Sequence, residues 1–133
     1  MTQSNISAAL STRLATIPSG YAIQYENQSF DPPANAPYLA ESLNPTPTNV
    51  VALSAAGSEA LQGFYQVLCY APAGMTKGPA FSAADAVEAL FPRGLRLTYN
   101  SVEVTILRTE RVIGFRSGDR FVVPISVYYW AAA

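Results

Sequence analysis

Two acidic side chains, Asp85 and Glu88, stand three residues apart in a stretch whose apolar spacing is that of a helix. That spacing places them on one helical face, where paired carboxylates can divide general acid and base work. The sequence supplies no third acid or histidine beside them to tune one carboxylate against the other. We therefore interpret the pair as a solvated helix face and not as a catalytic site.

The composition excludes several other kinds of active site. Without histidine there is no Ser-His-Asp triad, no imidazole base and no histidine-based zinc site. Cys69 is the one cysteine, and its apolar neighbours predict a small buried hydrophobe. Gly74, Lys77 and Gly78 lack the order of a phosphate-binding loop. We expect no enzyme, no cofactor and no metal.

Charge is scarce and unevenly distributed. Charged residues make up 13% of the chain, about half of their usual share in soluble domains, which predicts apolar surface buried against another protein. One basic and four acidic side chains precede Lys77, whereas seven basic and five acidic ones follow from it. Five of the bases are Arg96, Arg108, Arg111, Arg116 and Arg120. Acids are interleaved with them, so we expect a solvated hairpin or a charged contact with a protein in preference to a nucleic-acid site.

Two helices are predicted from periodicity and end signals. In the first, from about residue 4 to 16, apolar residues recur at intervals of four, four and three: Ile6, Leu10, Leu14 and Ile17. Pro79 in a first turn, with Ser82 and Asp85 as a weak capping box, opens a second helix that runs to Phe91. Both helices are expected to pack on a sheet.

Strands account for most of the remaining chain. The expected strands are Tyr21–Glu26, Tyr38–Leu43, Asn49–Leu53, Ala60–Tyr70, Leu95–Tyr99, Val102–Arg108, Glu110–Arg116 and Arg120–Trp130, with a turn at Ala55–Ser58. Ala60–Tyr70 is apolar on both faces and is expected to be central, whereas Pro124 predicts an edge position or a bulge in the last strand. The fold class is α+β: one domain over residues 1–133, with two helices on a mainly antiparallel sheet and C-terminal hairpins.

The segment from Asn27 to Thr48 contains five prolines. Proline cannot donate to a strand ladder, so the segment must be a shaped loop, an edge strand or both. It nevertheless carries the large apolar residues Phe30, Tyr38 and Leu39. They either fold back as a lid over the core or dock on a partner.

Several short motifs follow one another in an unusual order. They are Tyr25-Glu-Asn27, Phe30-Asp-Pro32, Pro37-Tyr-Leu39, Gly63 to Tyr70 with Ala71-Pro72, Phe91-Pro-Arg-Gly94 and Val123-Pro-Ile-Ser-Val-Tyr128. Together the motifs resemble the tail terminator proteins of long-tailed bacteriophages, over nearly the whole chain. The resemblance implies a structural virion protein: a hexameric ring at the head-proximal end of the tail tube, which stops tube polymerisation and offers a surface for head joining. It also implies assembly in the host cytoplasm.

Partners follow from the same resemblance: the tail tube protein on one face of the ring, a head-side connector or stopper on the other, and DNA passing through the lumen without specific binding. The expected contact residues lie in the proline-rich loop and the last hairpins: Phe30, Pro32, Tyr38, Leu39, Arg108, Arg111, Arg116 and Arg120. Two alternatives remain: another head–tail joining component, such as a stopper or completion protein, or a small-molecule binding module or enzyme with a tyrosine-rich pocket wall. We expect no signal peptide and no membrane segment.

Overall fold

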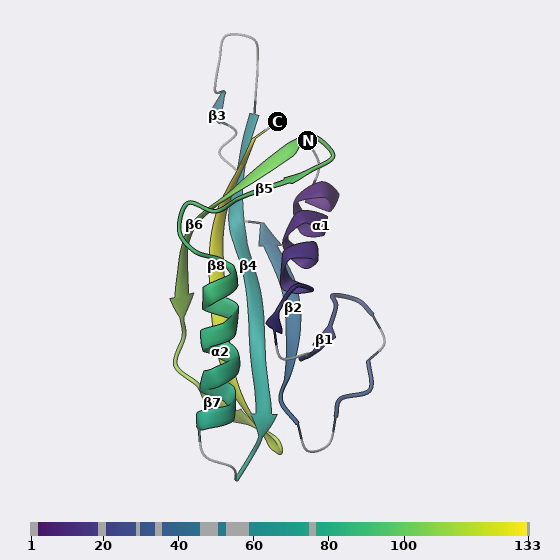
Figure 1. The fold of residues 1–133 in the computed structure, drawn as a ribbon, viewed down its shortest axis with the longest axis vertical. Helices are drawn as coiled ribbons and strands as arrows, with labels where there is room; N and C mark the ends of the chain where they lie inside the picture. The colour runs from purple at the N-terminus through teal and green to yellow at the C-terminus, as the bar shows by residue number, and fades with distance from the viewer. Residues whose placement is uncertain are drawn as a thin grey trace.

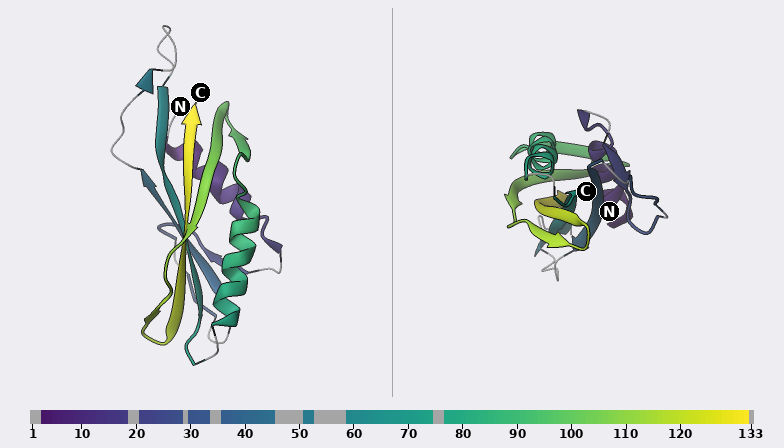
Figure 2. Two further views of the ribbon diagram at one scale, coloured as in Figure 1. Left: turned by 90° about the vertical axis from the view of Figure 1, so that its left-hand side faces the viewer. Right: turned by 90° about the horizontal axis from the view of Figure 1, so that it is seen from below.

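The protein folds as a curled sheet with both helices on one face (Figures 1 and 2). The computed structural model describes residues 3–18, 21–28, 30–33, 36–45, 51–52, 59–74 and 77–132. In these ranges the helices are α1 (Gln3–Leu14) and α2 (Gly78–Leu90), and the strands are β1 (Ala22–Gln24), β2 (Tyr38–Pro45), β3 (Val51–Ala52), β4 (Glu59–Pro72), β5 (Arg96–Tyr99), β6 (Val102–Arg111), β7 (Phe115–Ser117) and β8 (Arg120–Ala132). The predicted α+β class with a mainly antiparallel sheet is confirmed.

The strand order is β1-β2-β4-β8-β6-β5, with β3 paired to β4 and β7 paired to β8. Every pairing is antiparallel except that of β1 with β2. The two central strands, β4 and β8, pair from Ala60↔Ala132 to Pro72↔Arg120. This long ladder is the backbone on which the helices pack.

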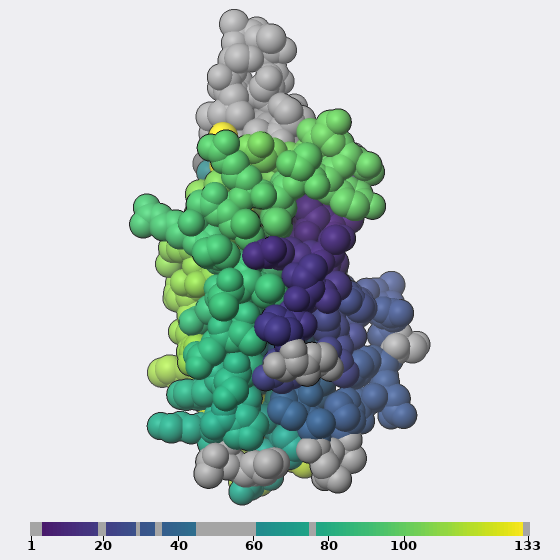
Figure 3. Space-filling view, viewed as in Figure 1, coloured from purple at the N-terminus to yellow at the C-terminus, as the bar shows by residue number. Residues whose placement is uncertain are grey.

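The helices close the core in the way that their apolar spacing predicts. All four residues of the predicted α1 stripe are buried, which confirms that prediction. The buried face of α2 consists mostly of small residues: Ala80, Ala83, Ala84, Val87 and Leu90. Figure 3 shows the two helices lying side by side over this face of the molecule. The predicted capping box is wrong, because α2 begins at Gly78 and Ser82 lies inside it; Pro79 occupies the first turn as predicted.

Strand β4 is central, as predicted, but its two faces differ. Tyr65, Val67 and Cys69 point into the core and have no exposed surface. Phe64, Gln66, Leu68 and Tyr70 alternate with them on the face that carries no helix, and they are only half-buried. Burial raises the pKa of the Cys69 thiol to about 12, so this cysteine is a buried hydrophobe and not a nucleophile.

The predicted edge position of the last strand is wrong, because β8 lies between β4 and β6. Pro124 is tolerated there because the chain beside it has left the ladder: β7 pairs with β8 up to Val122, and β6 resumes the pairing at Ile125. The Pro124 carbonyl accepts a hydrogen bond of 2.9 Å from the Val112 amide. The expected irregularity therefore lies in the neighbouring chain, where residues 112–114 belong to no strand.

Strand β2 is longer and less peripheral than the prolines suggest. Residues 38–40 pair with β1 on one side and with β4 on the other, whereas residues 41–45 pair with β4 alone. The flanking Pro37 precedes the paired region, so it withholds no donor from the ladder. The hairpin of β5 and β6 is confirmed and turns through Asn100 and Ser101, whose φ angles are 47° and 66°. The predicted turn at Ala55–Ser58 lies outside the described residues.

Within the described ranges, neither helix has the length and apolar character that crossing a membrane would require.

Candidate assembly surfaces

A polar cluster inside the fold is the arrangement that most resembles a catalytic site. The Glu41 carboxylate accepts hydrogen bonds from the Tyr65 hydroxyl at 2.6 Å and from the Ser11 hydroxyl at 2.7 Å. It also accepts one from the Glu26 amide at 3.2 Å. Both hydroxyls donate to the carboxylate, which ties α1, β2 and β4 together. Burial, and then the neighbouring Glu41, hold the pKa of Tyr65 well above its usual value, so the cluster is a structural joint.

The aromatic residues of the proline-rich segment form a stack on the helix-free face. The rings of Tyr38 and Tyr70 lie parallel with centroids 4.7 Å apart, and Phe30 packs on Tyr38 at 5.3 Å. Arg120 lies over the Tyr38 ring at 5.2 Å and donates to the carbonyl of Pro33 at 2.6 Å. The structure thus brings together two groups of residues that the sequence analysis treats as separate surfaces.

This arrangement changes which predicted contact residues can reach a partner. Leu39 is completely buried and Tyr38 is 7% exposed, so both belong to the lid over the core that the sequence analysis weighed against docking. Phe30 is half-buried and Pro32 is exposed. The Arg120 side chain is 12% exposed and holds the loop within its own subunit. Only Phe30 and Pro32 of this group present surface to a partner.

Two of the remaining arginines are also engaged within the subunit. Arg108 lies over the Tyr128 ring at 4.1 Å and forms an exposed ion pair of 2.9 Å with Glu110. Arg111 reaches α2, where it binds Asp85 at 2.5 Å and Glu88 at 2.9 Å. Hydrogen bonds from Glu88 and Asp85 raise the pKa of Arg111 above its usual value. The two acids that stood out in the sequence therefore anchor β6 to α2.

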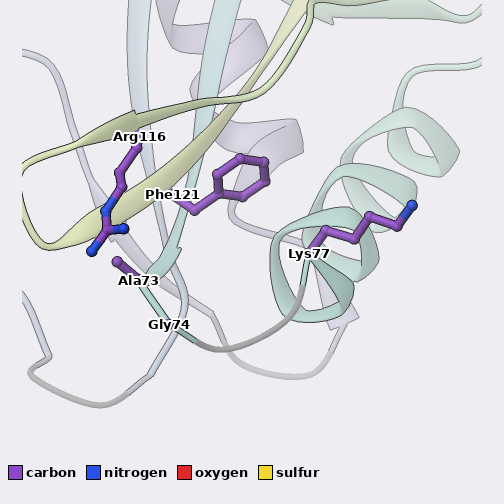
Figure 4. Close-up of a pocket in the computed structure, with 5 residues that line it drawn as sticks. All are labelled: Ala73, Gly74, Lys77, Arg116 and Phe121. Atoms are coloured by element: carbon purple, nitrogen blue, oxygen red, sulfur yellow. The ribbon is translucent and has the colours of Figure 1, made fainter.

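Arg116 differs from the other predicted arginines. It is exposed and makes no ion pair or hydrogen bond with the part of the chain that the structure describes. It lines a cavity of about 250 Å³ with Lys77 and Phe121. Figure 4 shows the Arg116 guanidinium on one side of the Phe121 ring and the Lys77 amine extending away from it on the other. The two cations diverge, so they do not form a cradle for one phosphate.

A neighbouring apolar surface was missed by the sequence analysis. A groove of about 430 Å³ lies between α2 and the segment that joins β6 to β7; we call it the α2 groove. Its apolar lining residues are Phe81, Val112, Ile113, Phe121 and Val123, with Gly114 between them. Ile113 is 88% exposed. The available signal was an uncharged run between Arg111 and Arg116, but the groove depends on the pairing register of Pro124, which local periodicity does not reveal.

Tyr129 can be used to measure what a buried hydroxyl contributes to the stability of this core. Its ring is buried, and its hydroxyl has no hydrogen-bond partner in the described part of the chain. We expect Tyr129→Phe to be as stable as the unmodified protein or more so at pH 8, because no hydrogen bond is lost.

The same substitution should change the response to alkaline pH. Burial raises the pKa of Tyr129 from 10.0 to about 12, so its contribution to stability is complete below pH 10 and is lost as the pH rises to 12. Between pH 8 and pH 11, where the first part of this loss develops, the unmodified protein should lose about 1.4 kcal/mol more than Tyr129→Phe. Urea unfolding at pH 8 and pH 11 measures this; equal losses would contradict it.

Two solved structures share this fold, and one protein family matches this sequence. One solved structure, whose title states no function, is 26% identical with a TM-score of 0.77, covering 98% of this chain and 96% of its own. A chain from the structure titled "Virion of native gene transfer agent (GTA) particle" is 15% identical with a TM-score of 0.65 over the same shares, and so shares the fold. No curated protein matches. The family model described as "Phage tail terminator protein" matches residues 5–129, and the chain accordingly belongs to this family of structural proteins of phage tails.

Proposed function

We propose that the protein forms a ring of six subunits that caps the head-proximal end of a phage tail tube. The ring stops polymerisation of the tube and contacts the tube protein on one side and a head-side connector or stopper on the other. The family match over residues 5–129 is the observation that carries this proposal. The shared fold with a virion chain of a gene transfer agent is compatible with it.

The surface of the subunit supports a role in assembly. Charged residues are only 13% of the chain, and Val112, Ile113 and Phe115 stand exposed within four positions. Half-buried aromatic residues also line the helix-free face of the sheet, among them Phe64, Tyr70 and Tyr128. Exposed apolar and aromatic residues of this kind are typical of the buried centre of protein interfaces.

Three of the four arginines proposed as contact residues are already engaged within the subunit, which is compatible with DNA passing through the ring without specific binding. Phosphate recognition needs cations that are free to replace counterions along the backbone. Arg108 is paired with Glu110, Arg111 is paired with two acids, and Arg120 donates to backbone carbonyls. We therefore expect no measurable affinity of the free protein for duplex DNA at physiological salt.

Tail length tests the proposed function. Particles assembled without this protein should carry overlong, headless tails, because nothing stops the growing tube. Negative-stain microscopy measures the length distribution, and supplying the unmodified protein from a plasmid should restore a single length. Normal-length tails without heads would instead identify a stopper, and tails of normal length with heads attached would exclude both roles.

A further inference from the structure

We infer that the α2 groove receives the loop of residues 30–33 from a second copy of this chain. This inference rests on the proposed ring and names the surfaces through which neighbouring subunits meet. It requires a groove that is rigid before binding, an occupant of complementary chemistry, and a placement of the two surfaces that forbids their meeting within one subunit.

The outer wall of the α2 groove is held in place at two points. It is fixed at one end by the hydrogen bond from the Val112 amide to Pro124. At the other end Gly114 passes so close to Phe121 that an added Cβ would lie 2.6 Å from the ring. Ile113 lies between these two fixed points and is 88% exposed. Its side chain is therefore held out of the core by the backbone on both sides, which leaves apolar area for a partner to bury.

Two cations near the groove, Lys77 and Arg116, have no ion pair among the described residues. Arg111 faces the groove, but Asp85 and Glu88 on α2 bind it. Lys77 lies at the start of α2 and packs over the Phe81 ring at 5.6 Å. Arg116 has no ion pair among the described residues and lies beside Phe121, which lines both the groove and the neighbouring cavity. A partner that fits this site carries an apolar group and an acid placed to reach Arg116.

The loop of residues 30–33 has that chemistry. Asp31 is exposed and, like Arg116, makes no ion pair within the described ranges. Phe30 packs one side of its ring on Tyr38 and remains half-buried. Arg120 holds the loop through the Pro33 carbonyl, so the loop is presented in a fixed form. It offers an aromatic ring and the Asp31 carboxylate to an apolar groove that has the Arg116 guanidinium beside it.

The two surfaces lie on opposite faces of the sheet. Arg120 holds the loop beside Tyr38 and Tyr70 on the helix-free face, whereas Arg116 lies beside Phe121, its register partner in β8, on the face that carries α2. They therefore meet only between copies, in a head-to-tail contact of two different surfaces. Repetition of such a contact builds a closed ring when the rotation between subunits closes.

A charge exchange tests the contact in assembled tails. Arg116→Asp and Asp31→Arg should each lower the fraction of tails of normal length by at least about tenfold, since each places like charges across the interface. The double variant, Arg116→Asp with Asp31→Arg, should restore that fraction, because the pair is remade in reverse. Both side chains are exposed and make no ion pair with the described residues, so all three proteins should unfold at the same urea concentration. Arg93→Asp, at another exposed arginine, is the matched control and should have no effect.

The outcomes separate this inference from the proposed function. Recovery in the double variant supports a contact between copies, since only a partner with the same substitutions can supply the reversed charge. Failure of the double variant to recover, or unaffected single variants, would overturn the inference while the unmodified protein still produced tails of one length. Failure of the proposed function would be recognised separately, as tails of normal length in the absence of the protein.

Discussion

Arg111→Glu should destabilise the subunit, with a loss of about 1–3 kcal/mol in the free energy of unfolding. Arg111 is 28% exposed and binds both Asp85 and Glu88 of α2. The reversal removes two ion pairs and places a third carboxylate against the two that remain. Urea unfolding at low salt measures the loss, which high salt should reduce because it screens like charges.

Two further variants at Arg111 separate the repulsion between carboxylates from the simple loss of the two ion pairs. Arg111→Gln removes the charge without reversing it and should lose less stability than Arg111→Glu. Arg111→Glu combined with Glu88→Arg rebuilds one pair in the opposite sense and should recover part of the loss. Arg116→Glu, at an exposed arginine that makes no ion pair with the described residues, should change stability by less than about 0.5 kcal/mol. If Arg111→Glu proved as stable as Arg116→Glu, the ion pairs of Arg111 would contribute nothing to the fold.

The sequence analysis treats these two arginines alike, as contact residues of the last hairpins, whereas the structure gives them different surroundings. Arg111 and Asp85 are 26 positions apart, and Arg120 and Pro33 are 87 apart. Such pairs depend on which strands become neighbours, and local periodicity carries no information about that. The family resemblance predicted a surface role for the hairpins without indicating which of their arginines are already paired.

Features that depend on local spacing were predicted well. The α1 stripe follows from intervals of three and four residues, and the β5–β6 hairpin from alternation around Asn100 and Ser101. The edge position predicted from Pro124 was wrong because a proline restricts only the side of the strand to which its nitrogen points. Its carbonyl is on that same side and meets the Val112 amide. The irregular chain opposite Pro124 then became one wall of the α2 groove, a consequence visible only once the register is known.

Glu41→Ala should be the second strongly destabilising change, with a loss of about 2–4 kcal/mol. The substitution removes the acceptor of both the Tyr65 hydroxyl and the Ser11 hydroxyl. Tyr65 is fully buried, so its hydroxyl loses its charged acceptor and keeps only the neighbouring Ser11 hydroxyl, in a place that water does not reach readily. The joint between α1, β2 and β4 is lost as well.

A double-mutant cycle separates two contributions to the loss of stability in Glu41→Ala: the lost hydrogen bond of the Tyr65 hydroxyl, and the lost hydrogen bonds of Glu41 to Ser11 and to the Glu26 amide. Tyr65→Phe alone should lose about 1–2 kcal/mol, because the buried carboxylate keeps Ser11 and the Glu26 amide as donors. In the double variant no tyrosine hydroxyl remains to lose its acceptor, so the total loss should be smaller than the sum of the two single losses. Urea unfolding of the four proteins at pH 7 gives the coupling energy. Simple additivity would mean that the hydrogen bond between Tyr65 and Glu41 contributes nothing, and that Glu41 acts only through α1 and the chain after β1.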